Sequence, residues 1–521
     1  MTAPQPPEKS AGDHVVADQS AVFALLADPA THGVKETVTR IDTHGAAVFL
    51  AGPYAYKVKR AVFFPFMDFS TLDKRRAACA AEVEISGAGA PGLYLGVVPI
   101  VRMADGLALG GDGEAVEYVV KMRRFDTNLT LDRITERGAL TPELTKDVAA
   151  MVVSAHAAAP ARRGFDSAGR LSTYLEDNIN EFAARPDLFP ANDVARLAEA
   201  SRAALVQVRL LLAARSEAGF VRRCHGDMHL RNIVLLDGKP VLFDAIEFND
   251  EIATCDVLYD LAFLLMDLWQ RGERHAANAI LNRYLWVSHD TQLDGLAALP
   301  LFLSLRAGIR AKVEAAGLAH LVEEKRSEGE ARVTHFFRHA CALIGGTQPQ
   351  PTLWGVGGLS GSGKSTWAAK AAVKVESRAP GAVVLRSDIE RKRLFNVPET
   401  EKLPPEAYAA EVSPRVYERL RRLARHVLTS GYTVIVDAVH ARPEERDALE
   451  DVAKEAGVPF NGLWLDAPAD EMVRRVTARS GDASDADAAV VRHQLAYDLG
   501  PIRWVRSQSP VSTSPAVPAL D

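Results

Sequence analysis

The chain has 521 residues, which is too long for one ordinary hydrophobic core, and a prior of about 100–200 residues per domain predicts two to four domains. Hydrophobic residues make up 48% of the chain and charged residues 25%, as in globular proteins. With 61 basic and 67 acidic residues the formal net charge is -6, which argues against a bulk nucleic-acid binder. Any phosphate binding must therefore come from local sites.

The chain shows no targeting or membrane-spanning signal. Residues 1–14 lack the apolar core of a signal peptide, and no run approaches the ~18 apolar residues of a membrane helix. The four cysteines form no C-x-x-C pair, which predicts reduced thiols; they are Cys79, Cys224, Cys255 and Cys341. Together these features predict a cytoplasmic protein without a membrane partner. Residues 1–14 and 506–521 are predicted to be disordered tails.

Short apolar runs separated by turn residues open the folded part of the chain. They predict strands at residues 37–41, 46–50, 54–60, 95–102 and 116–122, with a helix at 71–86 after the third strand. After Thr141 the pattern is mostly helical. A β-rich part followed by an α-rich part predicts an α+β, protein-kinase-like N-terminal domain over residues 15–345.

The segment His225-Gly226-Asp227-Met228-His229-Leu230-Arg231-Asn232 has the His-x-Asp-x-x-x-x-Asn spacing of a kinase catalytic loop. In such a loop Asp227 would accept the proton of the acceptor hydroxyl. Asn232 would turn back to a magnesium ion. The following strand would deliver Asp244 as a second metal ligand, and Glu247 could touch the metal or the substrate, although an ordinary surface carboxylate fits it equally well.

The sequence HGDMHLRNIVL, followed by LFDAIEF, resembles the aminoglycoside phosphotransferase family, in which HGDxHxxN precedes a strand that ends in Asp. Asp260-Leu261-Ala262 is similar to the start of that family's next helix. The resemblance implies that Lys57 contacts the ATP phosphates, with Lys59 as a rival on the same strand face, and that Glu82 is the helix partner of this lysine. It also implies a hinge around Met122 that would lie against adenine.

A Gly-, Gln- and Pro-rich stretch at residues 346–351 predicts a linker. Beyond it, strands expected at 352–357, 382–386, 433–437 and 462–466 alternate with helices, which predicts an α/β P-loop domain with a parallel sheet over residues 352–505. The chain is thus expected to be multidomain.

The second phosphate signature follows the first strand of this domain and has the G-x-x-x-x-G-K-[ST] spacing of a P-loop. Its backbone N–H groups would surround the phosphates of ATP, Lys364 would reach the β- and γ-phosphates, and Ser365 would bind Mg²⁺. The predicted nucleotide-binding residues are Gly358, Ser360, Gly361, Ser362, Gly363, Lys364, Ser365 and Thr366.

After the next strand, Asp388 and Arg391 are spaced so that both can face the γ-phosphate. This Asp-x-x-Arg pattern resembles the kinase domain of phage polynucleotide kinase and small P-loop kinases such as zeta toxins and gluconate kinases. The resemblance implies that Asp388 is the base for the acceptor hydroxyl and that Arg391 holds an anionic group. Asp437 ends a Walker-B-like strand and is a candidate metal ligand, or a cap of the following loop.

A helix with Arg474, Arg475 and Arg479 resembles the arginine-bearing lid of these kinases, and the resemblance favours Arg479 over Arg475 as the residue that reaches the transferring phosphate. An arginine-rich surface helix is the ordinary alternative.

The combination of the two signatures resembles bacterial bifunctional phosphotransferase/ATP-binding proteins. It predicts ATP- and Mg²⁺-dependent phosphoryl transfer at two sites, each to a hydroxyl of a small polar acceptor, with sugars or aminosugars favoured. Three alternatives stay open: the P-loop domain acts on a nucleic-acid 5′-hydroxyl, one site is a regulatory nucleotide sensor for the other, or the chain is a non-catalytic scaffold. The sequence does not indicate an oligomeric state.

Overall fold

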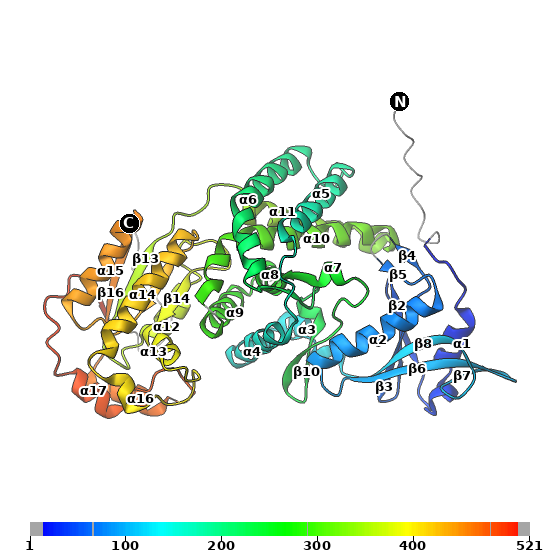
Figure 1. Ribbon diagram of the computed structural model, residues 1–521, viewed down its shortest axis with the longest axis horizontal. Helices are drawn as coiled ribbons and strands as arrows, with labels where there is room; N and C mark the ends of the chain where they lie inside the picture. The colour runs from blue at the N-terminus through cyan, green and yellow to red at the C-terminus, as the bar shows by residue number, and fades with distance from the viewer. Residues whose placement is uncertain (1–13, 65–66, 289, 480, 509–521) are drawn as a thin grey trace. The chain divides into compact units, whose positions relative to one another are not determined.

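The computed structural model describes residues 14–64, 67–288, 290–479 and 481–508, and it divides into two compact units (Figure 1). Unit 1 comprises Met1–Asp147, Ser154–Arg163 and Gly219–Asp260, and unit 2 comprises Val148–Val153, Gly164–Ala218 and Leu261–Asp521. The predicted tails lie outside the described residues, apart from His14 and residues 506–508. The last three belong to a strand.

Unit 1 is built on a six-stranded antiparallel sheet with the order β1-β2-β3-β8-β6-β7. The strands are β1 (Thr39–Asp42), β2 (Ala46–Ala51), β3 (Tyr54–Lys59), β6 (Tyr94–Met103), β7 (Gly106–Leu109) and β8 (Glu114–Arg123). Helix α2 (Leu72–Gly89) packs against β6 and β8, as Figure 1 shows. It begins where the Thr71 hydroxyl accepts the Lys74 N–H. All of these except β1 and β7 match the predicted elements closely.

Two small strand pairs frame the predicted catalytic loop of unit 1. β9 (Val221–Arg223) pairs with β12 (Thr254–Asp256), and β10 (Ile233–Leu236) pairs with β11 (Lys239–Leu242). Asp237 and Gly238 join the second pair with φ angles of 51° and 79°, the Asp-Gly geometry that favours a two-residue hairpin. The other elements that lie wholly in unit 1 are α1 (Ser20–Ala27), η1 (Pro29–His32), β4 (Phe63–Phe64), β5 (Met67–Asp68), η2 (Thr127–Leu129), α3 (Leu131–Glu136), η3 (Leu230–Asn232) and α7 (Asp250–Ala253). Helices α4 (Pro142–Ala158) and α8 (Val257–Gln270) run across the division between the units.

The first part of unit 2 is helical. Its helices are α5 (Ser167–Ala183), α6 (Ala191–Glu217), α9 (Arg274–Val287), η4 (Asp290–Gln292), η5 (Asp294–Ala298), α10 (Leu299–Gly317), η6 (Leu318–His320) and α11 (Glu323–Ile344). Phe182, Phe189 and Phe337 form an aromatic cluster at their centre, with ring centroids 4.5–5.2 Å apart. Ring pairs at this spacing add to the stability that their burial provides.

The second part of unit 2 is a five-stranded parallel sheet with the order β14-β15-β13-β16-β17. The strands are β13 (Leu353–Gly357), β14 (Val383–Arg386), β15 (Val434–Asp437), β16 (Phe460–Asp466) and β17 (Val505–Gln508). Every residue of β13, β14 and β15 is buried, as expected for parallel strands covered on both faces. The strand β17 was not among the predicted elements.

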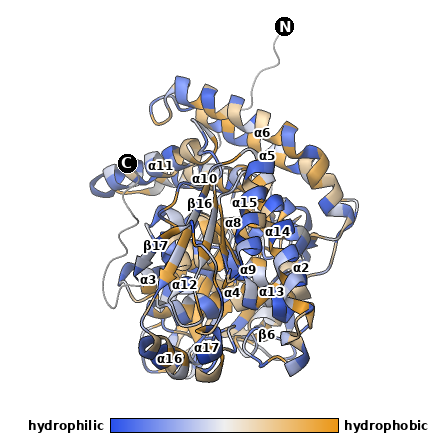
Figure 2. Ribbon diagram, turned by 90° about the vertical axis from the view of Figure 1, so that its left-hand side faces the viewer, coloured by the Kyte–Doolittle hydropathy of each residue, from blue (hydrophilic) through white to orange (hydrophobic). Residues whose placement is uncertain are grey.

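The helices of this part are α12 (Lys364–Ala371), α13 (Ser387–Leu394), η7 (Pro405–Tyr408), α14 (Val412–Thr429), α15 (Pro443–Ala456), α16 (Ala469–Ala478) and α17 (Ala488–Gln494). Helix α14 buries Val416, Leu420 and Leu423, whose spacing of three or four residues makes one apolar face. Figure 2 shows hydrophobic strands around β16 and much hydrophilic colour on α16 and α17.

Helix α9 covers the edge of the parallel sheet at β14. Asn278 Nδ2 and Asn282 Nδ2 donate to Ala382 O at 3.0 and 3.2 Å, and the Val384 N–H donates to Asn282 Oδ1 at 2.7 Å. Trp286 Nε1 donates to Val384 O at 2.8 Å. Side chains of α9 therefore satisfy backbone groups that the edge strand would otherwise leave unpaired. Among the described residues, no helix is both long and apolar enough to span a membrane.

Candidate active sites

The predicted catalytic loop of the first site is held by two buried side chains. The backbone N–H groups of His225 and Gly226 donate to the Asp260 carboxylate at 3.2 and 2.9 Å. His225 Nε2 lies 2.9 Å from Phe243 O, and burial lowers the pKa of this imidazole, so the neutral ring with its proton on Nε2 fits the contact. His225 thus braces the loop against the strand that precedes Asp244.

Asp260 also lies close to His156 and Cys224, and the ligand atoms of the three residues are within 4.8 Å of one another. The three side chains are buried. Because both Asp260 oxygens already accept backbone N–H groups, we assign this cluster to the support of the loop.

Asp227 and Asn232 come together at the end of the loop. Asn232 Nδ2 donates to the Asp227 backbone oxygen at 2.9 Å and to Asp227 Oδ2 at 3.0 Å. The Asp227 side chain remains 39% exposed, whereas Asn232 is buried. An exposed carboxylate held in place by a buried amide is suited to meet an incoming hydroxyl.

Lys57, Glu82 and Asp244 also meet in unit 1. Lys57 Nζ donates to Glu82 Oε1 at 2.8 Å and to Asp244 Oδ1 at 2.5 Å. Burial disfavours the charged form of Lys57, but Asp244 and Glu82 outweigh it and raise the pKa of Lys57 well above its usual value. The lysine is therefore a permanent cation. Asp244 has a φ of 61°, a left-handed conformation that Asp tolerates better than most residues.

The rival lysine, Lys59, binds the other oxygen of the same carboxylate. Lys59 Nζ donates to Glu82 Oε2 at 2.5 Å and also to Glu247. Lys59 is 2% exposed, and no contact that the described residues show joins it to Asp244. The contact with a candidate metal ligand therefore distinguishes Lys57 from Lys59.

Met122 faces the same side of the sheet as Lys57. It lies opposite Ala55 in the β3–β8 pairing, and Lys57 lies opposite Val120, so these four side chains share one face. Met122 packs in a buried cluster that includes Ala55 and Leu236. Met122 therefore offers apolar surface on the sheet face that carries Lys57, and its contact with adenine stays a prediction.

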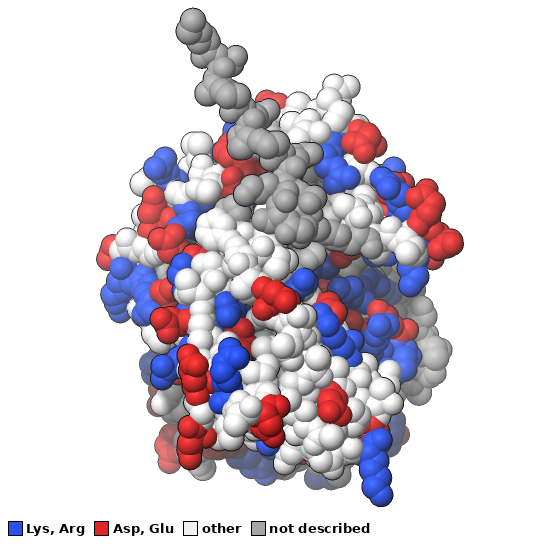
Figure 3. Space-filling model, turned by 90° about the vertical axis from the view of Figure 1, so that its right-hand side faces the viewer, with Lys and Arg blue, Asp and Glu red and all other residues white. Residues whose placement is uncertain are grey.

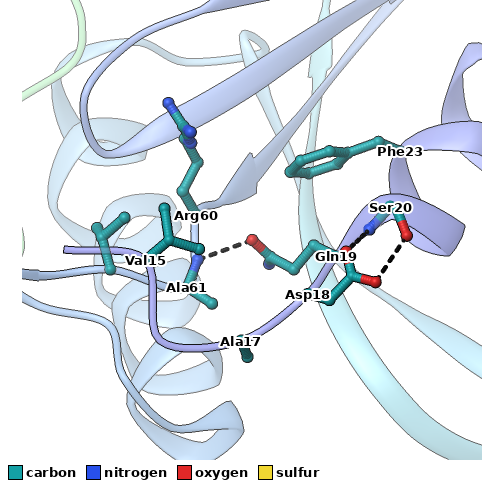
Figure 4. A pocket seen from close by; sticks show the side chains of 9 residues that line it. Val15, Ala17, Asp18, Gln19, Ser20, Phe23, Arg60 and Ala61 are labelled. Carbon is teal, nitrogen blue, oxygen red and sulfur yellow. Dashed lines mark hydrogen bonds between the residues drawn. The ribbon is translucent and has the colours of Figure 1, made fainter. Parts of the chain in front are cut away.

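A pocket at the N-terminal end of α1 lies among Val15, Gln19, Phe23 and Arg60 (Figure 4). Gln19 Oε1 accepts the Ala61 N–H at 2.7 Å, and Gln19 Nε2 donates to Lys59 O and Glu117 Oε2 at 2.9 and 2.7 Å. None of the predicted site residues lines this pocket. Its polar contacts fix the end of β3, and we assign it a structural role.

The second site is formed by the loop between β13 and α12, in the strand-loop-helix context that a P-loop requires. Gly358 and Gly361 have φ angles of 139° and 82°, and a Cβ atom on either would lie 2.5 Å from a backbone oxygen, of Leu465 and Met472 respectively. Only glycine fits there. Gly363 precedes the first residue of α12 with a φ of 94°.

The other P-loop residues differ in their surroundings. The Ser360 N–H donates to Gln494 Oε1 at 2.8 Å, and the buried Ser362 hydroxyl has no hydrogen-bond partner among the residues that the structure describes. Lys364 Nζ donates to Leu359 O at 2.9 Å, and burial lowers the pKa of Lys364. Thr366 is exposed on α12. The site therefore holds donors that a phosphate could take over.

Ser365 and Asp437, the two predicted metal ligands of this site, lie in contact. The Ser365 hydroxyl donates to Asp437 Oδ2 at 2.6 Å. Asp437 is 4% exposed, and this burial raises the pKa of its carboxyl. A hydroxyl and a carboxylate at the end of the P-loop helix and of the neighbouring strand are oxygen ligands of the kind that Mg²⁺ prefers, so these residues fit the ion.

Asp388 and Arg391 both lie on α13, but the described contacts do not join them. Arg391 donates to Ala407 O at 2.7 Å and to Ser413 Oγ at 3.1 Å, and its guanidinium lies 5.3 Å from the centre of the Tyr408 ring. Arg391 is thus anchored to the segment around η7. Asp388 is partly exposed in the first turn of the helix.

The two candidate lid arginines are placed differently. Arg475 Nη1 donates to the P-loop carbonyl of Gly361 at 3.2 Å, and its Nε donates to Glu471 at 2.7 Å. Arg479 lies just after the end of α16 and forms an ion pair with Asp482 at 3.7 Å. The helix that was expected to carry both arginines ends at Ala478, so only Arg475 lies on it.

Sequence reasoning missed Arg386, the last residue of β14. Its Nη2 donates to Ser365 Oγ at 3.2 Å and to Asp482 Oδ1 at 2.9 Å. Its Nε lies 3.5 Å from Asp437 Oδ2. No motif marks this arginine. The one available signal was its position two residues before Asp388, at the carboxyl end of a parallel strand, where ligand sites of α/β sheets lie.

Comparisons with known proteins cover both parts of the chain. Residues 93–298 match the phosphotransferase enzyme family, and residues 353–498 match a family described as AAA domain. The chain is 30% identical over 474 residues to uncharacterized proteins of Mycobacterium tuberculosis (Rv2004c) and Mycobacterium bovis (Mb2027c), covering 88% of this chain and 90% of each relative. The chain belongs to the family of these proteins. It joins a phosphotransferase domain to a P-loop domain, and the predicted fold class is confirmed.

Two solved structures show more distant likeness. A choline/ethanolamine kinase family protein from Mesorhizobium loti is 17% identical with a TM-score of 0.38, covering 63% of this chain and 98% of that protein. The APS kinase CysC of Mycobacterium tuberculosis is 29% identical with a TM-score of 0.19, covering 25% of this chain and 71% of that protein. The family matches, together with the two sites, make the protein an ATP-dependent, kinase-type phosphotransferase.

Proposed function

We propose that the protein has two separate phosphotransferase sites, each of which transfers the γ-phosphoryl group of Mg²⁺-bound ATP to a hydroxyl group of a small polar acceptor, with sugars or aminosugars favoured. The observation that carries the proposal is that each site combines a partly exposed Asp with a partly buried lysine and oxygen ligands for a metal. A nucleotide-binding scaffold would not need the Asp.

At the first site Asp227 accepts the proton of the acceptor hydroxyl as that oxygen attacks the γ-phosphorus. The amide of Asn232 holds the carboxylate in place. Asn232 and Asp244 would hold Mg²⁺, which when bound neutralises charge on the phosphates, and Lys57 would leave Asp244 for a phosphate oxygen. Met122 and its neighbours in the sheet would face the adenine.

At the second site the backbone of the P-loop and Lys364 bind the phosphates, and Ser365 and Asp437 would hold Mg²⁺. Asp388 accepts the proton of the acceptor hydroxyl, and Arg391 binds an anionic group of the acceptor. Arg479, and Arg475 beside the loop, stabilise the negative charge on the transferring group. We further propose that residues 15–345 and 352–505 form the two kinase domains and that 346–351 link them.

The experiment that tests this proposal uses labelled ATP, Mg²⁺ and a pool of sugars, aminoglycosides, nucleosides and oligonucleotides, with the full chain and with Asp227→Asn and Asp388→Asn variants. We expect two labelled products, each lost in one variant only. Loss of one product in both variants would instead show that one site regulates the other. Labelled oligonucleotide would favour the nucleic-acid alternative, against which the net charge of -6 speaks. Figure 3 shows acidic and basic side chains intermixed on the face that carries the N-terminal sheet. ATP left intact with every acceptor would refute the proposal.

A further inference from the structure

Arg386 joins three acidic or hydroxyl side chains that come from different elements of the P-loop domain. Ser365 belongs to α12, Asp437 ends β15, and Asp482 follows α16. The guanidinium contacts all three, at 3.2 Å to Ser365 Oγ, 3.5 Å to Asp437 Oδ2 and 2.9 Å to Asp482 Oδ1. Only 10% of the Arg386 side chain is exposed.

The hydrogen bonds of this buried guanidinium are incomplete. Among the described residues Arg386 Nε has no hydrogen-bond partner, and the nearest carboxylate oxygen, Asp437 Oδ2, lies 3.5 Å away. The guanidinium lies over the indole ring of Trp286, 5.7 Å from the ring centre, which favours the cation at this place. A buried arginine with an unused donor is prepared to accept a further anionic partner.

Two of the three partners of Arg386 are also the expected ligands of magnesium. A metal ion bound by Ser365 and Asp437 would compete with the guanidinium for the same two oxygens, because both are cations. Asp482 is not in the predicted metal-binding pair, and it also lies 3.7 Å from the candidate lid residue Arg479. Displacement from Ser365 and Asp437 would leave Arg386 attached to Asp482.

We propose that Arg386 takes the place of the metal in the P-loop site until Mg²⁺ arrives: while Ser365 and Asp437 hold the guanidinium, its unused donor serves the phosphates of metal-free nucleotide, and Mg²⁺ then displaces it from these two oxygens. The inference rests on the proposed function of this site as a Mg²⁺-ATP site. It implies that the site keeps a cation for the phosphates even when ATP carries no metal. Nucleotide binding without metal should therefore depend on Arg386 more strongly than binding of Mg²⁺-ATP.

The test compares ATP binding in Mg²⁺ and in EDTA by calorimetry, without acceptor. The full chain carries Asp244→Asn and Lys57→Met to silence the first site, with and without Arg386→Gln. We expect Arg386→Gln to weaken binding of metal-free ATP about tenfold, the loss of one charge-assisted contact, and binding of Mg²⁺-ATP by less than about threefold. Arg386→Lys should lie between the two. Equal losses in both conditions, or no loss in either, would overturn the proposal.

A second variant leaves Arg386 in place. Asp482→Asn removes the carboxylate that competes with the phosphates for the guanidinium, so we expect it to strengthen the binding of metal-free ATP. Unchanged or weaker binding would count against the proposal. This result can be obtained even if Arg386→Gln does not fold. Lys364→Ala in the same background identifies the site. If ATP binding survives that change, or is absent before it, the proposed function of the P-loop site fails. This outcome is distinct from equal losses of ATP affinity in Mg²⁺ and in EDTA, which would refute only the proposed role of Arg386.

Discussion

In the first site, Lys57 and Lys59 share the carboxylate of Glu82 but differ in their second partner. Lys57 and Lys59 each bind one oxygen of Glu82, which is fully buried. The second partner of Lys57 is Asp244, whose side chain is 44% exposed, whereas the second partner of Lys59 is the buried Glu247. Lys57 is therefore placed where an incoming phosphate could replace a partner, and Lys59 is not.

Substitution of the two lysines by methionine should have different consequences. In a chain with the P-loop silenced by Lys364→Ala, we expect Lys57→Met to lower the rate of transfer at the first site by about 10²–10³, since it removes a preorganised cation from the phosphates. We expect Lys59→Met to cost about 3–5 kcal/mol of unfolding free energy, because it breaks a buried ion pair. Steady-state kinetics and urea unfolding measure the two effects. The reverse assignment of effects would show that Lys59 is the phosphate-binding lysine.

The buried side chain of His440 should make the unfolding free energy of the protein fall in acid. It is 1% exposed, and burial lowers its pKa to about 3. The unfolded chain has a His pKa near ~6.5, so the unfolded state takes up the proton first and the native state loses stability as the pH falls from about 6.5 toward 3. At pH 5 the loss from this residue is about 2 kcal/mol relative to pH above 7.

The measurement is the unfolding free energy of the wild-type chain and of His440→Asn at pH 7.5 and pH 5. Asparagine does not titrate, and it tolerates the left-handed φ of 52° at this position. We expect the variant to be less stable at pH 7.5 but to lose less stability on acidification. Equal acid losses in the two proteins would mean that His440 is not neutral in the native state.

Individual site residues could be predicted from the sequence where a motif fixes both the residue type and the spacing. The catalytic loop and the P-loop predicted residues that the fold brings together, such as Asp227 with Asn232 and Ser365 with Asp437. The sequence could not distinguish Lys57 from Lys59, because alternation on a strand places both on one face. It could not find Arg386, because the partners of this arginine come from distant segments of the chain.

Among the elements, β14 and α9 depend on one another. β14 is the edge strand of the parallel sheet and ends just before Ser387 and Asp388. On its free side the hydrogen-bond partners are the buried side chains of Asn278 and Asn282 and the indole of Trp286. The helix therefore does for this strand what a sixth strand would do, and it also helps to fix the residues that follow the strand.

Removal of the Asn282 amide tests this dependence. Asn282→Leu leaves the Val384 N–H buried without its partner, for which we expect a loss of about 1–3 kcal/mol in unfolding free energy. His275→Leu is the control, since it places leucine at an exposed position of the same helix and should change stability by less than about 0.5 kcal/mol. Urea unfolding measures both. A loss no larger than that of the control would show that α9 does not hold β14.

The elements themselves were largely predictable, because apolar alternation and turn residues mark the strands of unit 1 and continuous apolar runs mark β13, β14 and β15. The role of α9 was not predictable. Its Asn278 and Asn282 have no special spacing relative to any motif, and only the folded chain shows that their partners are Ala382 and Val384, about a hundred residues away.

The two compact units of the molecule do not coincide with the two proposed kinase domains. Unit 2 contains the helices α5, α6, α9, α10 and α11 together with the whole parallel sheet. Within it, Asp290 of η4 binds Arg393 of α13 and Arg419 and Arg422 of α14 at 2.6–2.9 Å. The helical part of the first domain is thus part of the support of the P-loop sheet.

This arrangement predicts that the P-loop domain is incomplete when it is cut from the rest of unit 2. A fragment of residues 346–521 lacks α9 and η4, so the outer edge of β14 is exposed and the cluster of Arg393, Arg419 and Arg422 loses Asp290. Unpaired strand edges promote association, so we expect the fragment to unfold at lower urea concentration than the P-loop part of the full chain and to aggregate on concentration. A fragment of residues 261–521, which keeps α9 and η4 but loses α5 and α6, should be the less aggregating of the two. Urea unfolding and sedimentation compare them, and a fragment 346–521 that is monomeric and as stable as the full chain would show that the parallel sheet does not need its helical neighbour.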